Sequence, residues 1–282
     1  MNSYDMKKVN KWLDKRKIYD IRLIYFNESF SFVIWPMILA CDDNELDACK
    51  YMYENGAADH IHKIDEVYGY NTMIISCLSG NLEICKWLYD MGAQNLITKK
   101  NIGDRTPMFH ACGKGHLHVC EWLYEKGAHQ DIFTPNNFGR TPMHIACFNN
   151  HLSVCKWLFK NGVVFDKDNL KDNLNCTAMS LAMNNNSISV CKWLFLILPL
   201  DKQTQQHLTI APETRPEIEV WVKDILSTHN NFFKLIIYTY FLRNSSLLGK
   251  LCMDNIKLIS SFVGVKTGNS LKLIREINKL YN

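Results

Sequence analysis

Cysteine is the residue type in this sequence whose spacing most suggests chemistry. The 282-residue chain contains 11 cysteines, and eight of them form pairs separated by eight positions: Cys41/Cys49, Cys77/Cys85, Cys112/Cys120 and Cys147/Cys155. A structural zinc site needs four converging ligands, commonly from C-x₂-C knuckles, and no such knuckle occurs here. Cysteine also packs as a small buried hydrophobic residue. We therefore interpret the pairs as core positions and predict no metal site, with a metal ladder and redox sensing as alternatives.

The ten histidines are the second group of residues with catalytic potential. Catalysis by histidine requires a reacting group within reach and a partner that orients the ring. The sequence contains no glycine-rich phosphate loop, no H-E-x-x-H and no G-x-S-x-G. No nucleophile, base and orienting partner can be assembled in the C-terminal segment either. We therefore predict no catalytic residues, no cofactors and no enzymatic activity.

The cysteines instead mark an internal repeat. Three segments align without gaps and begin at Tyr70, Arg105 and Arg140. A cysteine and a tryptophan recur in each of them at intervals of 35 residues, and Cys191 and Trp193 follow 36 positions later in a looser copy. A further copy begins at Trp35. The sequence therefore contains five copies in register over residues 35–198.

Each copy is predicted to fold as helix, turn and helix, as the third copy illustrates. Thr106 can cap the first helix, Pro107 suits its first turn, and Gly115 accepts the left-handed backbone of a tight turn. The second helix carries an apolar stripe at helical spacing: Leu117, Cys120 and Leu123. Gly127 then ends it. The polar stretches between copies, such as residues 129–139, are expected to form β-turn or hairpin fingers. The tryptophans lie on the same interior stripe, so we expect them in the core: Trp87, Trp122 and Trp157.

The fourth copy, RTPMHIAC followed by NNHLSVCKWLFKNG, closely resembles the ankyrin repeat, in which Thr-Pro-Leu-His opens the first helix and Gly-Ala closes the second. The resemblance implies an all-α ankyrin-repeat solenoid of about five helix–turn–helix repeats, with β-turn or hairpin fingers and a C-terminal helical cap. It also implies that His116, His144 and His151 link neighbouring repeats by hydrogen bonds. The third copy has Phe109 where the family has histidine, and the fifth has Ala178 where it has proline. We expect the outer repeats to be irregular.

The resemblance also implies a function, because ankyrin repeats bind proteins through their finger tips and the exposed side of the short first helices. The protein is thus expected to be a non-catalytic scaffold that binds one protein partner on its concave face. Aromatic and arginine side chains are favourable anchors on such a face. The predicted partner-binding residues are Val67, Tyr68, Tyr70, Leu78, Ser79, Ile102, Arg105, Lys114, Asn137, Phe138, Arg140, Phe148, Asn149, Asn173, Asn184 and Asn185. For Phe138 and Tyr68 the alternative is packing between adjacent fingers.

The two ends of the chain differ from the repeats in composition. Residues 1–34 are predicted to form an N-terminal helical cap or a degenerate repeat. Residues 199–216 are polar and contain prolines, as a connector would. Residues 217–282 are expected to form three or four helices, with Asp254 and Asn269 as N-caps, that either cap the fifth repeat or form a small helical module beyond it.

One stretch of the C-terminal segment supports an alternative function. LLGKLCMDNI resembles the short helix with which SOCS-box proteins bind elongins, and it faintly resembles an F-box helix. The resemblance implies that Leu248, Cys252 and Ile256 would recruit an elongin and cullin, which would make the protein a ubiquitin-ligase substrate adaptor. Leu247 departs from the elongin pattern, and no proline-rich cullin-contact segment follows.

Composition limits the remaining possibilities. The formal charge of +4 is mild, and the lysines are spread along the chain, which does not favour a nucleic-acid partner. The N-terminus lacks the apolar core of a secretory signal, and the longest apolar run, residues 232–242, is too short to span a membrane. We therefore expect a soluble monomer in the cytoplasm, with the nucleus as an alternative, and no membrane or nucleic-acid partner.

Overall fold

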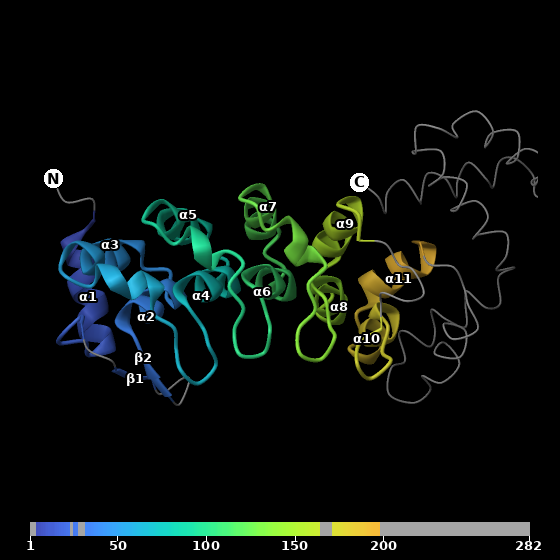
Figure 1. Ribbon diagram of the computed structural model, residues 1–282, viewed down its shortest axis with the longest axis horizontal. Coiled ribbons are helices and arrows are strands. Elements are labelled where there is room, and N and C mark those ends of the chain that lie inside the picture. The colour runs from blue at the N-terminus through green and yellow to red at the C-terminus, as the bar shows by residue number, and fades with distance from the viewer. Residues whose placement is uncertain (1–3, 23–24, 28–31, 164–170, 198–282) are drawn as a thin grey trace, which may run out of the picture. The chain divides into compact units, whose positions relative to one another are not determined.

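A computed structural model describes residues 4–22, 25–27, 32–163 and 171–197 of the chain (Figure 1). The chain divides into two units, Met1–Cys191 and Lys192–Asn282. The predicted connector, residues 199–216, and the predicted C-terminal helices, residues 217–282, lie outside the described residues. The adaptor residues lie outside them as well: Leu248, Cys252 and Ile256.

The described part of the repeat region consists of five helix pairs. A short inner helix is followed in each pair by an outer helix: α2 (Pro36–Asp42) and α3 (Leu46–Glu54), α4 (Thr72–Ser79) and α5 (Leu82–Asp90), α6 (Pro107–Lys114) and α7 (Leu117–Glu125), α8 (Pro142–Phe148) and α9 (Leu152–Lys160), α10 (Ala178–Asn184) and α11 (Ile188–Ile197). Short 3-10 turns follow three of the outer helices: η1 (Ala58–His62), η2 (Gln94–Leu96) and η3 (His129–Ile132). The all-α repeat architecture predicted from the sequence is confirmed.

The predicted helix signals act as expected. The Thr106 side chain accepts a hydrogen bond from the Phe109 amide, as predicted, and Thr177, which was not predicted as a cap, accepts one from the Ser180 amide. These bonds satisfy amide groups that have no partner within a helix. The turn between inner and outer helix holds a left-handed residue in each pair, for example Gly115 at φ +80°. A Cβ atom at Gly115 would also lie 2.4 Å from the His151 ring, so glycine is required there for space as well as for backbone conformation.

Stacking of the inner helices builds the core. α2 packs on α4, α4 on α6, α6 on α8, and α8 on α10. The same inward position holds a buried methionine in every repeat, at most 2% exposed: Met37, Met73, Met108, Met143 and Met179. Each helix pair therefore buries its apolar side only against its neighbours, as expected for a solenoid.

The outer helices are joined by a ladder of aromatic rings. A tyrosine of one repeat meets the tryptophan of the next edge to face, at 5.7 Å for Tyr53–Trp87, 5.8 Å for Tyr89–Trp122 and 5.6 Å for Tyr124–Trp157. Trp122 is buried, as predicted, but Trp87 and Trp157 are only half-buried. The prediction was wrong for these two, whose rings pack on Tyr53 and Tyr124 but keep part of their surface exposed to solvent.

The N-terminal segment combines a helix with a β-hairpin. α1 (Met6–Arg16) packs on α3, and β1 (Tyr25–Asn27) pairs antiparallel with β2 (Phe32–Ile34). Trp12 Nε1 donates to Asp43 Oδ2 at 2.8 Å, and the Arg16 guanidinium pairs with the same carboxylate. Burial opposes ionisation of Asp43, but hydrogen bonds from Arg16 and Trp12 outweigh it and lower its pKa. α1 is thereby fixed to the turn between α2 and α3.

Candidate protein-binding surface

The four described fingers are built on one recurring polar residue. Asp65, Asn101, Asn136 and Asp172 stand at the base of the fingers and are at most 8% exposed. In each finger this side chain accepts hydrogen bonds from backbone amides further along the loop, for example from Phe138 and Arg140 onto Asn136 Oδ1, both at 3.0 Å. An Asx side chain that replaces backbone acceptors in this way fixes a tight turn. The fingers are therefore ordered by local bonds before any partner binds.

Neighbouring fingers are also bonded to one another. The Ile102 amide donates to the Tyr68 carbonyl at 3.2 Å, the Asn137 amide to the Gly103 carbonyl at 3.2 Å, and the Asn173 amide to the Phe138 carbonyl at 2.9 Å. This row continues the stacking of the inner helices into the fingers, which project on one side of them in Figure 1. The predicted turn or hairpin fingers are confirmed. We call the surface formed by the fingers and the exposed side of α4, α6, α8 and α10 the finger face.

All sixteen predicted partner-binding residues are exposed or half-buried. The exposed ones are Val67, Tyr68, Ile102, Lys114, Asn137, Phe138, Asn149, Asn173, Asn184 and Asn185. The half-buried ones are Tyr70, Leu78, Ser79, Arg105, Arg140 and Phe148. Phe138 is 55% exposed and Tyr68 48%, so burial between fingers does not account for either ring.

Several of the asparagines predicted to bind a partner form hydrogen bonds between neighbouring repeats. Their side-chain amides donate to carbonyls of the preceding repeat, from Asn137 to Ile102 at 3.1 Å, from Asn149 to Gly113 at 2.6 Å and from Asn185 to Phe148 at 2.8 Å. Asn173 donates to the Asn137 carbonyl at 3.0 Å in the same manner. These amides hold repeats together, which leaves mainly their oxygen atoms for a partner.

A groove of about 400 Å³ lies on the finger face across α4, α6 and α8. Seven predicted residues line it: Tyr70, Leu78, Arg105, Lys114, Phe138, Arg140 and Asn149. Five residues that were not predicted complete the lining: Phe109, His110, Gly113, Asn136 and Ile145. An alignment of the copies could have indicated His110, because this residue occupies the position of Ile145 in the next repeat.

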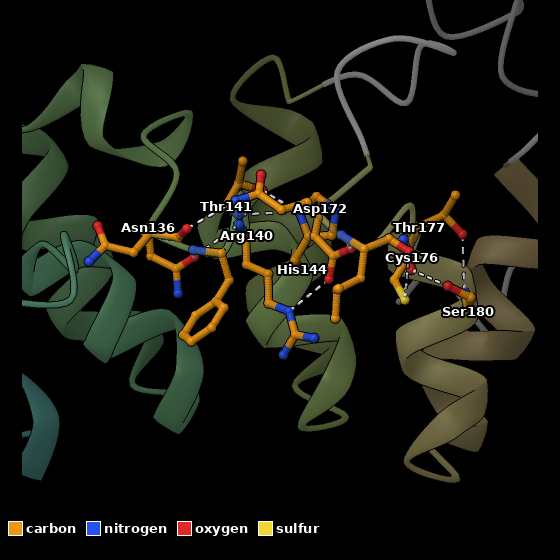
Figure 2. A network of polar contacts seen from close by, with 12 residues as sticks. Asn136, Arg140, Thr141, His144, Asp172, Cys176, Thr177 and Ser180 are labelled. Atoms are coloured by element: carbon orange, nitrogen blue, oxygen red, sulfur yellow. Dashed lines mark hydrogen bonds and ion pairs between the residues drawn. The ribbon is translucent and has the colours of Figure 1, made fainter.

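A chain of polar contacts borders the groove on its C-terminal side (Figure 2). Arg140 Nε donates to Asp172 Oδ2 at 2.9 Å, and the side chain of Asp172 has no exposed surface. Burial opposes ionisation of Asp172, yet hydrogen bonds from the Cys176 amide and from Arg140 outweigh it and lower its pKa. His144 Nδ1 accepts a bond from the Thr141 amide at 3.2 Å and closes a capping box at the start of α8.

On its other side the groove contains polar groups without partners. His110 is 6% exposed, and its Nε2 and the Nε of Arg105 are buried without a hydrogen-bond partner among the described residues. Burial, together with the charges of Arg105 and Lys114, lowers the pKa of His110 to about 4, so this imidazole is neutral at pH 7. The Tyr70 ring meets the His110 ring edge to face at 5.6 Å.

Comparison with known families agrees with this architecture. A family model described as ankyrin repeats (3 copies) matches residues 93–169 and, in an overlapping second match, residues 129–206. Residues 93–206 are therefore identified as ankyrin repeats. No curated protein matches the chain.

In these ankyrin repeats the turn histidines link neighbours, as the resemblance implied. His116 Nε2 lies 3.2 Å from the Leu78 carbonyl, and His151 Nε2 lies 3.1 Å from the Gly113 carbonyl. Both carbonyls are near the C-terminus of an inner helix, where intrahelical partners are absent. His144 also bonds within its own repeat, where its Nδ1 contacts the amide and the hydroxyl of Thr141.

The paired cysteines lie inside the ankyrin core. Their sulfur atoms are 3.9 Å apart for Cys41/Cys49 and 3.5 Å apart for Cys112/Cys120, and all four pairs are buried free thiols. Burial raises the pKa of Cys77, and likewise that of Cys147, well above its ordinary value. Within the described ranges no group of three or more His, Cys, Asp or Glu residues is placed to hold a metal ion. The interpretation of the pairs as core residues is confirmed by their burial.

Among the helices that the structure describes, none is both long and apolar enough to cross a membrane. Leu248, Cys252 and Ile256 lie outside the described residues, so their role in recruiting a ubiquitin ligase stays a prediction.

Proposed function

We propose that the ankyrin repeats act as a non-catalytic scaffold that binds a protein partner through the finger face. The observation that carries the proposal is a row of exposed apolar side chains on the finger tips. Val67 is 53% exposed, Ile102 61%, Phe138 55% and Leu174 71%. Large apolar side chains gathered on one surface are typical of a protein interface.

The build of the fingers supports the same function. Fingers that are fixed by Asx side chains and bonded to one another lose little conformational entropy when a partner binds. The tips then present apolar anchors, and the groove behind them offers aromatic and arginine side chains, which are the residue types that contribute most at interfaces.

Phe138 and Phe133 allow a matched test. Both are exposed phenylalanines of the same loop region, at 55% and 46%, but only Phe138 is on the finger face, since Phe133 directly follows η3. Affinity purification from cells that express the protein would compare the wild type with Phe138→Ser and Phe133→Ser. We expect the partner to be recovered with the wild type and with Phe133→Ser but lost with Phe138→Ser. Recovery with all three proteins would place the partner elsewhere.

The same purification tests the alternative of a ubiquitin-ligase adaptor. A Leu248→Ala/Cys252→Ala variant would lose an elongin and cullin while it keeps the partner bound by the finger face. If the wild type recovers neither an elongin nor a cullin, the adaptor hypothesis is wrong.

A further inference from the structure

One residue that lines the groove on the finger face is a glycine where the neighbouring repeats have large apolar side chains. Gly113 on α6 stands at the position that holds Leu78 in the second repeat and Phe148 in the fourth. Gly113 is buried, and a Cβ atom there would lie 3.0 Å from Cγ1 of Ile145. A side chain at this position would press on Ile145, so the neighbouring helix α8 lies close to α6 here, and both residues line the groove.

The third repeat also places polar groups where its neighbours have apolar or neutral ones. His110 replaces the aliphatic residue found as Ile75 and Ile145, and its Nε2 is buried without a partner among the described residues. An unpaired polar group in the interior costs stability. Lys114, at the end of α6, stands where the adjacent copies have Ser79 and Asn149. The departures of this repeat from the others thus converge on one groove and make it more polar.

The charge of the groove is entirely positive. Arg105, Lys114 and Arg140 line it, and no aspartate or glutamate is among its lining residues. Arg140 is already paired with the buried Asp172. Arg105 and Lys114 form no ion pair within the described part of the chain. Arg105 is half-buried, with its Cζ 5.9 Å from the centre of the Phe109 ring.

We propose that this groove binds a carboxylate, supplied by an aspartate or glutamate within a short acidic and apolar segment of a protein partner, between Arg105 and Lys114. A guanidinium can hold a carboxylate through two parallel hydrogen bonds. The aromatic walls formed by Tyr70 and Phe109 exclude part of the solvent, which strengthens such a pair relative to one in water. Complementary charge at this position also selects acidic partners over basic ones. The inference rests on the proposed function, since it names the chemistry of the partner at the same surface.

Fluorescence anisotropy with a defined probe tests the proposal. The probe is a short labelled peptide in which glutamate and leucine alternate, and its counterpart carries glutamine at every glutamate position. Arg105→Gln should weaken binding of the acidic peptide about tenfold, because a half-buried charge-assisted contact is lost. Lys114→Gln should weaken it about threefold, because the lysine is exposed. Lys160→Gln, an exposed lysine on α9, serves as the matched control and should leave affinity unchanged.

Three results would overturn the proposal. The first is equally tight binding of the glutamine peptide and the acidic peptide. The second is no detectable binding of the acidic peptide. The third is a loss of affinity for the acidic peptide with Lys160→Gln that is as large as the loss with Lys114→Gln. A single-stranded oligothymidine that binds more tightly than the acidic peptide, and loses affinity with Arg105→Gln, would assign the groove to phosphate instead. Circular dichroism of each variant shows that the fold is retained.

The purification experiment separates failure of this inference from failure of the proposed function. A partner that is lost with Phe138→Ser but retained with Arg105→Gln and Lys114→Gln refutes the carboxylate site and leaves the scaffold function standing. A partner that is retained with Phe138→Ser refutes the proposed function, whereas the peptide titration still decides the chemistry of the groove.

Discussion

Replacing Asp131 with asparagine is expected to stabilise the ankyrin repeats at neutral pH and to change their stability little near pH 4. Asp131 lies in η3, is 7% exposed, and its Oδ2 is buried without a hydrogen-bond partner among the described residues. Burial raises its pKa from 3.8 to about 6, while Lys100 and a hydrogen bond with Thr106 pull in the opposite direction. The folded protein therefore holds this carboxyl group in a place that disfavours its charged form.

The sign and size of the effect follow from the two pKa values. Because the pKa in the folded chain is the higher one, folding takes up a proton between pH 3.8 and about 6, and stability falls as the pH rises through that range. A pKa difference of this size corresponds to at most ~3 kcal/mol in the free energy of unfolding. Screening by solvent reduces this free energy, so we expect Asp131→Asn to add about 1–2 kcal/mol at neutral pH.

Urea unfolding followed by circular dichroism measures the difference. The midpoint for Asp131→Asn should lie at higher urea than that of the wild type at neutral pH, with an unchanged slope, and should nearly coincide with it near pH 4. Asp90→Asn is the control, because Asp90 is an exposed carboxylate at the end of α5. An equal change at both pH values, or a loss of stability at neutral pH, would refute the argument from buried ionisation.

Other substitutions test the packing, the links between repeats and the thiols. Leu123→Ala should lower the free energy of unfolding by about 2–5 kcal/mol, because this side chain is fully buried; a loss below about 1 kcal/mol would contradict the packing. His116→Ala should cost about 1–2 kcal/mol in the same assay, because it removes the contact with the Leu78 carbonyl. In a Cys252→Ser background, a thiol reagent should react quickly with the half-exposed Cys176 and with the buried thiols only after denaturation. Rapid reaction of several thiols in the native protein would show that the core opens.

Much of the fold could be predicted because each repeat carries its own local signals. Thr106 caps an inner helix, and Gly115 adopts the left-handed backbone of the turn, as the sequence indicated. Such signals act within a few residues and are therefore visible in a single copy. Their recurrence at a fixed interval made the stacking predictable as well.

What the sequence did not reveal depends on contacts between copies or on deviations from the period. The contacts of Trp87 with Tyr53 and of Trp157 with Tyr124 join outer helices of different copies, so no single repeat encodes them. The pairing of β1 with β2 was missed because its strands are three residues each, too short to show alternation. The Asx residues of the fingers were missed for a different reason. They recur in the sequence, but acidic and amide residues are common in polar loops and do not stand out from their neighbours.

Under the proposed function, stability and partner selection depend on different positions of the same repeat. The inward methionines recur in all five copies and the paired cysteines in four, and all of them are buried, so these positions serve the packing of the stack. The third repeat departs elsewhere, at His110, Gly113 and Lys114, all of which line the groove. Because each repeat contacts only its neighbours, such departures reshape one part of the finger face without disturbing the rest of the stack. In an array of this kind the period identifies the fold, and positions where one copy breaks it are the first to examine for binding.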